Sequence, residues 1–114
     1  MTNEQIRKLD FSKVYEAILG KVTRKGHTEE ELLEIICWLM GYEAEDVKLF
    51  HGLTYGDFFE QAPAWNPKRM LITGSICGEK VQEITDPFRR DMRCLDKMVD
   101  ELVKGKSKDK IFRT

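Results

Sequence analysis

The chain has 114 residues, 41% of them hydrophobic, and a formal net charge of -1 at pH 7. This length suits one compact core and is too short for two ordinary domains, so we expect a single domain with a short basic tail at residues 106–114. The near-zero charge excludes a whole-molecule field that draws in nucleic acid or anionic membranes. No apolar run approaches the roughly 20 residues of a membrane helix, and residues 1–10 lack the apolar core of a secretory signal. We therefore expect a cytoplasmic protein without a membrane partner.

The cysteines and histidines suggest neither a disulfide framework nor a metal site. Cys37, Cys77 and Cys94 are odd in number and far apart in sequence, which predicts reduced, buried thiols. Together with His27 and His51 they show no metal-ligand spacing. We therefore expect no metal, no cofactor and no catalytic cysteine.

The first expected helix covers residues 9–25, where apolar residues recur at alternating spacings of three and four. Asp10 and Ser12 are both good N-cap residues, and the sequence does not choose between them. Gly20 either costs about 1 kcal/mol relative to alanine or marks a close packing contact. Gly26 ends the helix.

The second expected helix begins at a capping box, in which Thr28 and Glu31 satisfy each other's backbone amides. Residues 32–40 follow almost without a polar break, which predicts a central helix of the core. Gly41 followed by Tyr42 indicates a left-handed cap with an apolar residue folding back on the last turn.

The middle of the chain carries weaker signals. Residues 44–50 and 54–59 predict two short helices, and Pro63 stops the second. Pro67 and a helical spacing of apolar residues predict a kinked helix over residues 66–85, with a strand or a loop as the alternative.

Two glycines, Gly74 and Gly78, interrupt that segment. Residues 74–80 superficially resemble a phosphate-binding loop, but the glycines are four apart instead of five and Glu79 stands where lysine should follow. On a helix, glycines four apart allow another backbone to approach closely, so leucine at either position is expected to cost about 1 to 3 kcal/mol.

Residues 87–104 form the best-defined helix. Asp86 is a suitable N-cap, Pro87 suits the first helical position, and Gly105 ends the helix. Its apolar stripe is Phe88, Met92, Leu95, Val99 and Leu102. The chain is thus expected to be one all-α domain of five or six helices, with this helix and the one at residues 28–40 forming the core.

After the last helix, the basic tail is expected to be a solvated end that only Ile111 and Phe112 can anchor. Nucleic acid is not an expected partner, because Glu43, Glu45 and Asp46 would face the phosphates in the only helix-turn-helix candidate.

Three arginines at the start of the last helix form the candidate ligand-binding site. Arg89 and Arg90 lie in the first turn, where the helix dipole disfavours cations, and Arg93 lies one turn further on. Two explanations remain open. The arginines either pair with nearby carboxylates or, together with the free amides of the helix start, hold a small anion such as a phosphate or carboxylate. The carboxylates considered are Glu79, Glu83, Asp86 and Asp91.

Large apolar residues are numerous for a chain with a limited interior, and such residues often lie at interfaces. The residues are Trp38, Phe58, Phe59, Trp65 and Phe112. They favour a non-enzymatic protein-interaction or oligomerisation module, with a protein partner or a homodimer. The alternative is a binding protein or enzyme for a small anionic ligand at Arg89, Arg90 and Arg93.

Four stretches of the sequence carry a resemblance to a bacterial family called domain of unknown function 2200, over Phe11 to Arg113. They are Ile36-Cys37-Trp38-Leu39-Met40-Gly41-Tyr42, Phe58-Phe59-Glu60-Gln61-Ala62-Pro63, the segment Asn66-Pro67-Lys68-Arg69 with Leu71-Ile72-Thr73-Gly74 and Cys77-Gly78, and Leu95-Asp96-Lys97-Met98-Val99-Asp100-Glu101-Leu102. The resemblance implies a small cytoplasmic all-helical protein, an orthogonal helical bundle. It implies no activity, ligand or catalytic residue.

Overall fold

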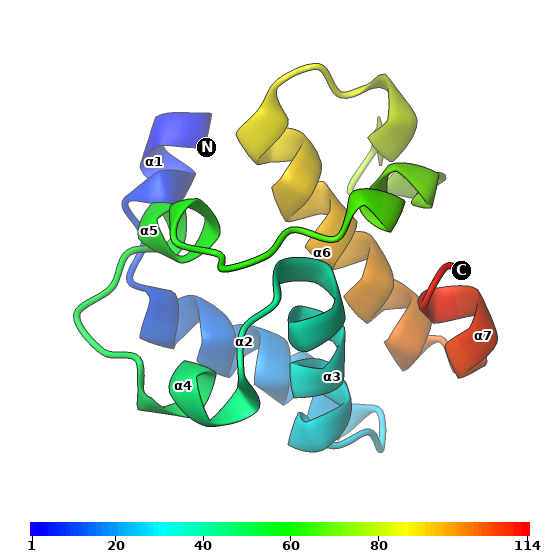
Figure 1. The fold of residues 1–114 in the computed structure, drawn as a ribbon, viewed down its shortest axis with the longest axis horizontal. Helices are drawn as coiled ribbons and strands as arrows, with labels where there is room; N and C mark the ends of the chain where they lie inside the picture. Colours follow the sequence, from blue (N-terminus) through cyan, green and yellow to red (C-terminus); the bar gives the residue numbers. More distant parts are fainter.

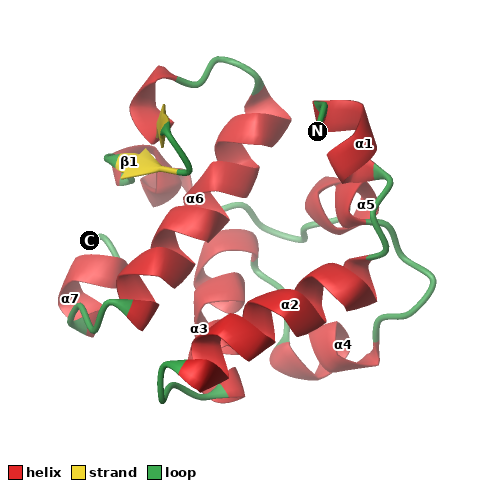
Figure 2. Ribbon diagram, turned by 180° about the vertical axis from the view of Figure 1, so that it is seen from behind, coloured by secondary structure: helices red, strands yellow, loops and turns green.

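The computed structural model describes residues 1–114 and is mostly helical, with one small antiparallel sheet (Figures 1 and 2). The α-helices are α1 (Asn3–Arg7), α2 (Phe11–Arg24), α3 (Glu29–Met40), α4 (Ala44–Leu49), α5 (Tyr55–Glu60), α6 (Pro87–Val103) and α7 (Lys108–Ile111). Between α5 and α6 lie the 3-10 helix η1 (Pro67–Leu71), the strands β1 (Ser75–Ile76) and β2 (Glu79–Lys80), and the 3-10 helix η2 (Val81–Glu83). None of the helices combines the length and the apolar character needed to cross a bilayer.

Helices α3 and α6 form the centre of the core, as the sequence predicts. Six residues of α3 and eight of α6 are buried, and α2 packs against both helices. The all-α prediction is correct to a first approximation, with seven α-helices instead of five or six and a two-stranded sheet in addition. The orthogonal arrangement of the helices stays a prediction.

A cluster of aromatic rings fills the core beside α5. The Phe58 ring lies 4.3 Å from that of Phe11 and 5.0 Å from that of Tyr42, measured between centroids. The Tyr42 hydroxyl donates a hydrogen bond of 2.7 Å to the Phe58 carbonyl, and burial raises the pKa of Tyr42 to about 12. Phe58 and Phe59, expected as possible interface residues, are therefore part of the core.

The local signals at the helix ends are confirmed. Asp10 is the N-cap of α2, with its carboxylate accepting from the Ser12 amide, which decides between the two candidates. The capping box of Thr28 is present. Gly41 has a φ of 80°, and a Cβ there would lie 2.9 Å from the Ala64 amide nitrogen. The αL conformation and the close approach of the chain at Ala64 both require glycine at this position.

The prediction of a kinked helix over residues 66–85 is wrong. Residues 75–80 form a hairpin, in which Ile76 pairs with Glu79 across a two-residue turn. Both turn residues have positive φ, 51° for Cys77 and 79° for Gly78, as in a type I′ turn. The helical spacing is real, but the backbone of a type I′ turn cannot belong to a helix. The close-packing argument also fails. A Cβ on Gly78 would meet nothing within 4 Å, and one on Gly74 would meet the Lys97 side chain at 3.1 Å but no other backbone.

Both ends of the chain carry short helices that were not expected. α1 begins with a capping box between Thr2 and Gln5, a pattern that is visible in the sequence. α7 lies in the basic tail, where Ile111 is buried. The expectation of a solvated end is therefore wrong, although Ile111 and Phe112 are the anchors that the sequence offers.

Candidate functional site

The three candidate arginines lie where the hairpin packs against the start of α6. Asp86 caps the helix, with its carboxylate accepting a 2.8 Å hydrogen bond from the Arg89 amide. The hairpin brings Glu79 to the same place, because β1 contacts α6 and β2 follows directly after the turn. The site is therefore built from two segments that are joined only by η2 and a short loop.

Arg89 pairs with Glu79 through two hydrogen bonds. Its Nη2 lies 2.6 Å from Glu79 Oε1 and its Nε 2.8 Å from Oε2, while Nη1 donates to Asn3 Oδ1 of α1 at 2.9 Å. These hydrogen bonds from Arg89 are the main reason that the pKa of Glu79 falls to about 2. Carboxylate pairing is thus confirmed for Arg89. The hydrogen bond from Arg89 to Asn3 also links α1 to α6.

Arg93 shares the same carboxylate. Its Nε lies 3.1 Å from Glu79 Oε1 and its Nη1 lies 2.8 Å from Asp96 Oδ2. Burial raises the pKa of Asp96. Arg93 and Asp96 line a cavity of about 280 Å³ together with Lys21, Cys77 and apolar side chains.

Arg90 points away from this carboxylate. Its Nη1 lies 3.4 Å from the Gln82 carbonyl, and its buried Nε has no hydrogen-bond partner. The structure therefore brings Arg89 and Arg93 together around Glu79 and leaves Arg90 outside the cluster.

The cysteines are free thiols, but only Cys94 is buried, so the expectation of three buried thiols is wrong for Cys37 and Cys77. Burial raises the pKa of the Cys94 thiol to about 11. Cys77 is exposed because it lies in the hairpin turn. Cys37 is exposed because it lies on the outer face of α3.

A groove over the outer face of α3 is the largest hollow on the protein, with a volume of about 550 Å³. We call it the α3/α4 groove, and its lining residues are Glu30, Leu33, Glu34, Cys37, Trp38, Glu43, Ala44, Lys48 and Phe112. Five of these are spaced i, i+3, i+4, i+7 and i+8 along α3, so they share one helix face. The Gly41 cap turns the chain back and places α4 beside this face.

The floor of the α3/α4 groove is apolar. Leu33 is buried at its base, while Trp38 and Ala44 are half-buried on its two helices. Phe112 closes one end, with its ring centroid 6.1 Å from that of Trp38. Cys37 adds an exposed thiol to the lining.

The rim of the groove is acidic. Glu30, Glu34 and Glu43 are exposed, and Lys48 is the single cation among the lining residues. Glu34 pairs with Lys108 of α7 at 3.2 Å, whereas Glu30 and Glu43 form no ion pair. The groove thus combines an apolar floor with two carboxylates that have no cationic partner.

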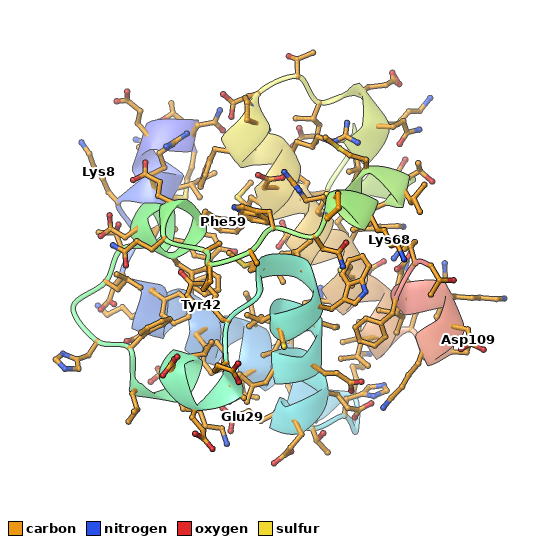
Figure 3. All side chains as sticks on the ribbon, viewed as in Figure 1. Lys8, Glu29, Tyr42, Phe59, Lys68 and Asp109 are labelled. Carbon is orange, nitrogen blue, oxygen red and sulfur yellow. The ribbon has the colours of Figure 1, made fainter.

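The C-terminal tail is fastened beside this groove by a buried ion pair. Arg113 Nη1 lies 2.6 Å from Glu101 Oε1 and its Nη2 lies 2.8 Å from Oε2. The Glu101 side chain is only 5% exposed. In Figure 3 the α7 helix, labelled at Asp109, lies next to α3 at the same side of the molecule. The pair therefore holds Phe112 in place as one wall of the groove.

Sequence reasoning identified Trp38 and Phe112 as interface candidates but did not bring them together. The i, i+3, i+4 spacing of the α3 lining residues is visible in the sequence. What the sequence did not supply is the docking of the tail, since composition alone favours a solvated end for residues 106–114.

Comparison with known proteins identifies the family of the chain but no activity. No curated protein matches it. Its fold is similar to the solved structure described as "Crystal structure of uncharacterized protein SP1917", with 44% sequence identity and a TM-score of 0.90 over 96% of this chain and 92% of that one. The model of the family described as "Uncharacterized protein conserved in bacteria (DUF2200)" matches residues 5–113. Because this match covers nearly the whole chain, the protein belongs to the DUF2200 family of uncharacterized bacterial proteins.

Proposed function

We propose that the protein is a non-enzymatic interaction module that binds a polypeptide segment in the α3/α4 groove. The observation that carries this proposal is the groove's combination of size, shape and lining. A hollow of about 550 Å³ between two helices, with an apolar floor and a polar rim, has the form of grooves that accept an amphipathic segment.

The groove also concentrates residues that are typical of binding surfaces. Trp38 and Phe112 are large aromatic side chains left half-buried in its lining. Aromatic residues in such positions supply most of the binding energy at protein interfaces. Of the other aromatic residues expected at an interface, Phe58 and Phe59 are buried in the core. Trp65 is half-buried and stacks on Phe59 outside the groove.

The test is a selection of peptides from a displayed random library with no charge bias. Selected peptides are then measured against the parent and against a Cys37→Arg variant, in which a long cationic side chain fills the groove. Ala17→Arg is the matched control, because Ala17 is exposed on α2 and does not line the groove. Peptides that bind the parent and Ala17→Arg but not Cys37→Arg support the proposal. A failure to enrich any peptide, or equal binding to all three proteins, overturns it.

A second candidate function is the binding of a small anion at Arg89 and Arg93. It is favoured by one observation, that both arginines line hollows, of about 360 Å³ and about 280 Å³, while sharing the single carboxylate of Glu79. An anion that displaced Glu79 would meet a guanidinium fork that is already oriented.

This second candidate is tested by titrating phosphate against the melting temperature at constant ionic strength. The parent is compared with an Arg89→Ala, Arg93→Ala double variant. Saturable stabilisation of the parent that is lost in the variant supports an anion site. Equal responses would be a general salt effect and would leave Arg89 with the structural role that its pairing with Glu79 already gives it.

A further inference from the structure

The charges around the α3/α4 groove point to the chemistry of its partner. We infer that the groove binds a cationic polypeptide segment, which inserts a large apolar side chain beside Trp38 and places lysine or arginine side chains against Glu30 and Glu43. This inference rests on the proposed function, because it specifies the partner of the same groove.

The first argument is charge complementarity. Glu30 lies on α3 and Glu43 is the N-cap residue just before α4. Both are exposed along the rim, and neither has a cation within ion-pair distance. The floor between them is apolar, so a ligand that enters must offer apolar surface below and positive charge at its edges. Complementary charges of this kind contribute mainly to partner choice and to the association rate.

The second argument is that the chain's own tail already meets this face in the same way. Phe112 packs against Trp38, with 6.1 Å between ring centroids, while Lys108 pairs with Glu34 at 3.2 Å. One aromatic side chain and one lysine of a basic segment therefore occupy one end of the acidic, apolar face. The remaining length of the groove offers the same chemistry, with Glu30 and Glu43 in place of Glu34.

A second copy of the chain is a poorer match for this site. The exposed apolar residues that a second copy offers include Leu49, Met70 and Leu71. Leu49 lies next to Lys48 on α4 itself, and Met70 and Leu71 follow Lys68 and Arg69 in η1. In η1 the Arg69 guanidinium is already paired with Asp91 at 3.0 Å, which leaves only Lys68 to meet the carboxylates of the rim. Self-association through η1 is an explicit alternative outcome of the test.

The test uses the full-length protein and a fluorescein-labelled peptide with a central isoleucine-phenylalanine pair and two lysines on each side. Binding is followed by fluorescence anisotropy at two salt concentrations. We expect saturable binding that weakens with salt. Replacing the peptide's phenylalanine by alanine should weaken binding about tenfold or more, since it removes the anchor. A peptide with glutamates in place of the lysines should not bind measurably.

The matched protein variants are two double substitutions. Glu30→Gln with Glu43→Gln removes the rim charges and should weaken binding about fivefold, as expected for two exposed ion pairs. Glu45→Gln with Asp46→Asn removes the same charge from exposed positions of α4 that do not line the groove, and should leave binding unchanged. Because both double variants change only exposed side chains, each can be checked for an unchanged melting temperature before binding is compared.

Five results would overturn the inference. Equal weakening by both double variants would mean general attraction to an acidic protein, and equal binding of the glutamate peptide would remove any role of charge. A dimer in light scattering that Cys37→Arg dissociates would show that a second copy occupies the groove. If library peptides occupy the groove but carry no excess of lysine and arginine, the cationic inference fails while the proposed function stands. If no peptide of any charge depends on the groove, both fail.

Discussion

At the scale of single residues, Glu79 explains how the fold tolerates Arg89 in the first turn of α6. Each cation there is disfavoured by the helix dipole by roughly 0.3 to 1 kcal/mol. The Glu79 carboxylate lies within 3.1 Å of both Arg89 and Arg93, and it reaches them only because the hairpin turn reverses the chain. The arginines were visible in the sequence as a departure from a local rule. Which carboxylate compensates them depended on a turn that the sequence reading took for a helix.

This role of Glu79 gives a pH dependence of known sign. Its pKa lies at about 2 in the folded protein, against 4.5 for an ordinary glutamate, so its ionised form stabilises the native state above about pH 4.5. That stabilisation is lost as the pH falls from about 4.5 towards about 2. In thermal melts, Glu79→Gln should have a lower melting temperature than the parent at neutral pH. The gap between the two melting temperatures should close as the pH falls over this range. Glu83→Gln is the control, because Glu83 is exposed and its ion pair with Lys80 is 3.9 Å long, so its gap should be small at every pH. A constant gap for Glu79→Gln would contradict the account.

The hairpin turn gives a second prediction. Here the sign of the change in the free energy of unfolding distinguishes backbone strain from packing. Cys77 adopts a φ of 51°, which costs a non-glycine residue about 1 to 2 kcal/mol and is tolerated best by asparagine. Cys77→Asn should therefore stabilise the protein in urea denaturation, and Gly78→Ala should destabilise it by about 1 kcal/mol or more.

Gly20→Ala is the control for the hairpin variants. Gly20 lies inside α2, and a Cβ there would meet only the mobile end of Arg24, at 3.2 Å. This variant should stabilise the protein by about 0.5 to 1 kcal/mol. If Gly78→Ala behaved like Gly20→Ala, the positive φ at Gly78 would carry no cost and the proposed turn would be wrong.

At the scale of elements, the sequence predicts best where a helix end is set by nearby residues. The predicted caps at Thr28, Gly41 and Asp86 depend on hydrogen bonds within about four residues, and all three are confirmed. At the start of α2 the structure selects Asp10 from the two candidates that the sequence left open. The long helices α2, α3 and α6 follow for the same reason, because periodicity and capping agree there. The helix prediction for residues 66–85 fails because the apolar spacing fits a helix, whereas Cys77 and Gly78, both with positive φ, form a turn. Tertiary contacts decided between the two.

For the tail the prediction from the sequence fails in the opposite direction. Its composition is polar, which favours a solvated end, but its few apolar residues pack in or against the core. Residues 108–113 are held by the burial of Ile111 and by the ion pair of Arg113 with Glu101. Neither contact is local in sequence, because Glu101 lies on α6 and precedes the Gly105 turn. This is why the α3/α4 groove, which needs Phe112 as a wall, could not be predicted in full from the sequence.

The ion pair gives a prediction at this scale. Arg113→Ala leaves Glu101 buried with only a distant lysine, Lys106 at 3.9 Å, so the tail should detach to hydrate the carboxylate. Hydrogen exchange should then increase at the amides of α7, while the amides of α3 stay protected. Lys110→Ala is the control, because Lys110 is exposed and forms no ion pair. Equal exchange in α7 for the parent and Arg113→Ala would mean that the burial of Ile111 holds the tail alone.

At the scale of the whole molecule, the single core supports two surfaces that differ in their charges, one around Glu79 and one at the α3/α4 groove. Around Glu79 the charges are largely satisfied within the chain, which gives that region a structural role of joining α1, the hairpin and α6. Over α3 and α4 the floor is apolar, and two of the three rim carboxylates, those of Glu30 and Glu43, have no cationic partner. This surface has unpaired charges and half-buried aromatic side chains, so a bound partner can supply the missing contacts. We therefore propose the α3/α4 groove as the binding surface.

The two exposed thiols allow binding at the α3/α4 groove to be tested with an internal control, because both lie on the same chain. Cys37 lines the α3/α4 groove and Cys77 lies in the hairpin turn outside it, while Cys94 is buried. Alkylation of the full-length protein by N-ethylmaleimide is followed by mass spectrometry, with and without a peptide selected for binding. At a peptide concentration ten times its Kd, we expect alkylation of Cys37 to slow about tenfold, in proportion to the unoccupied fraction, while the rate at Cys77 stays the same. Unchanged alkylation of Cys37 by a peptide that saturates the protein would contradict the claim that the groove is the binding site.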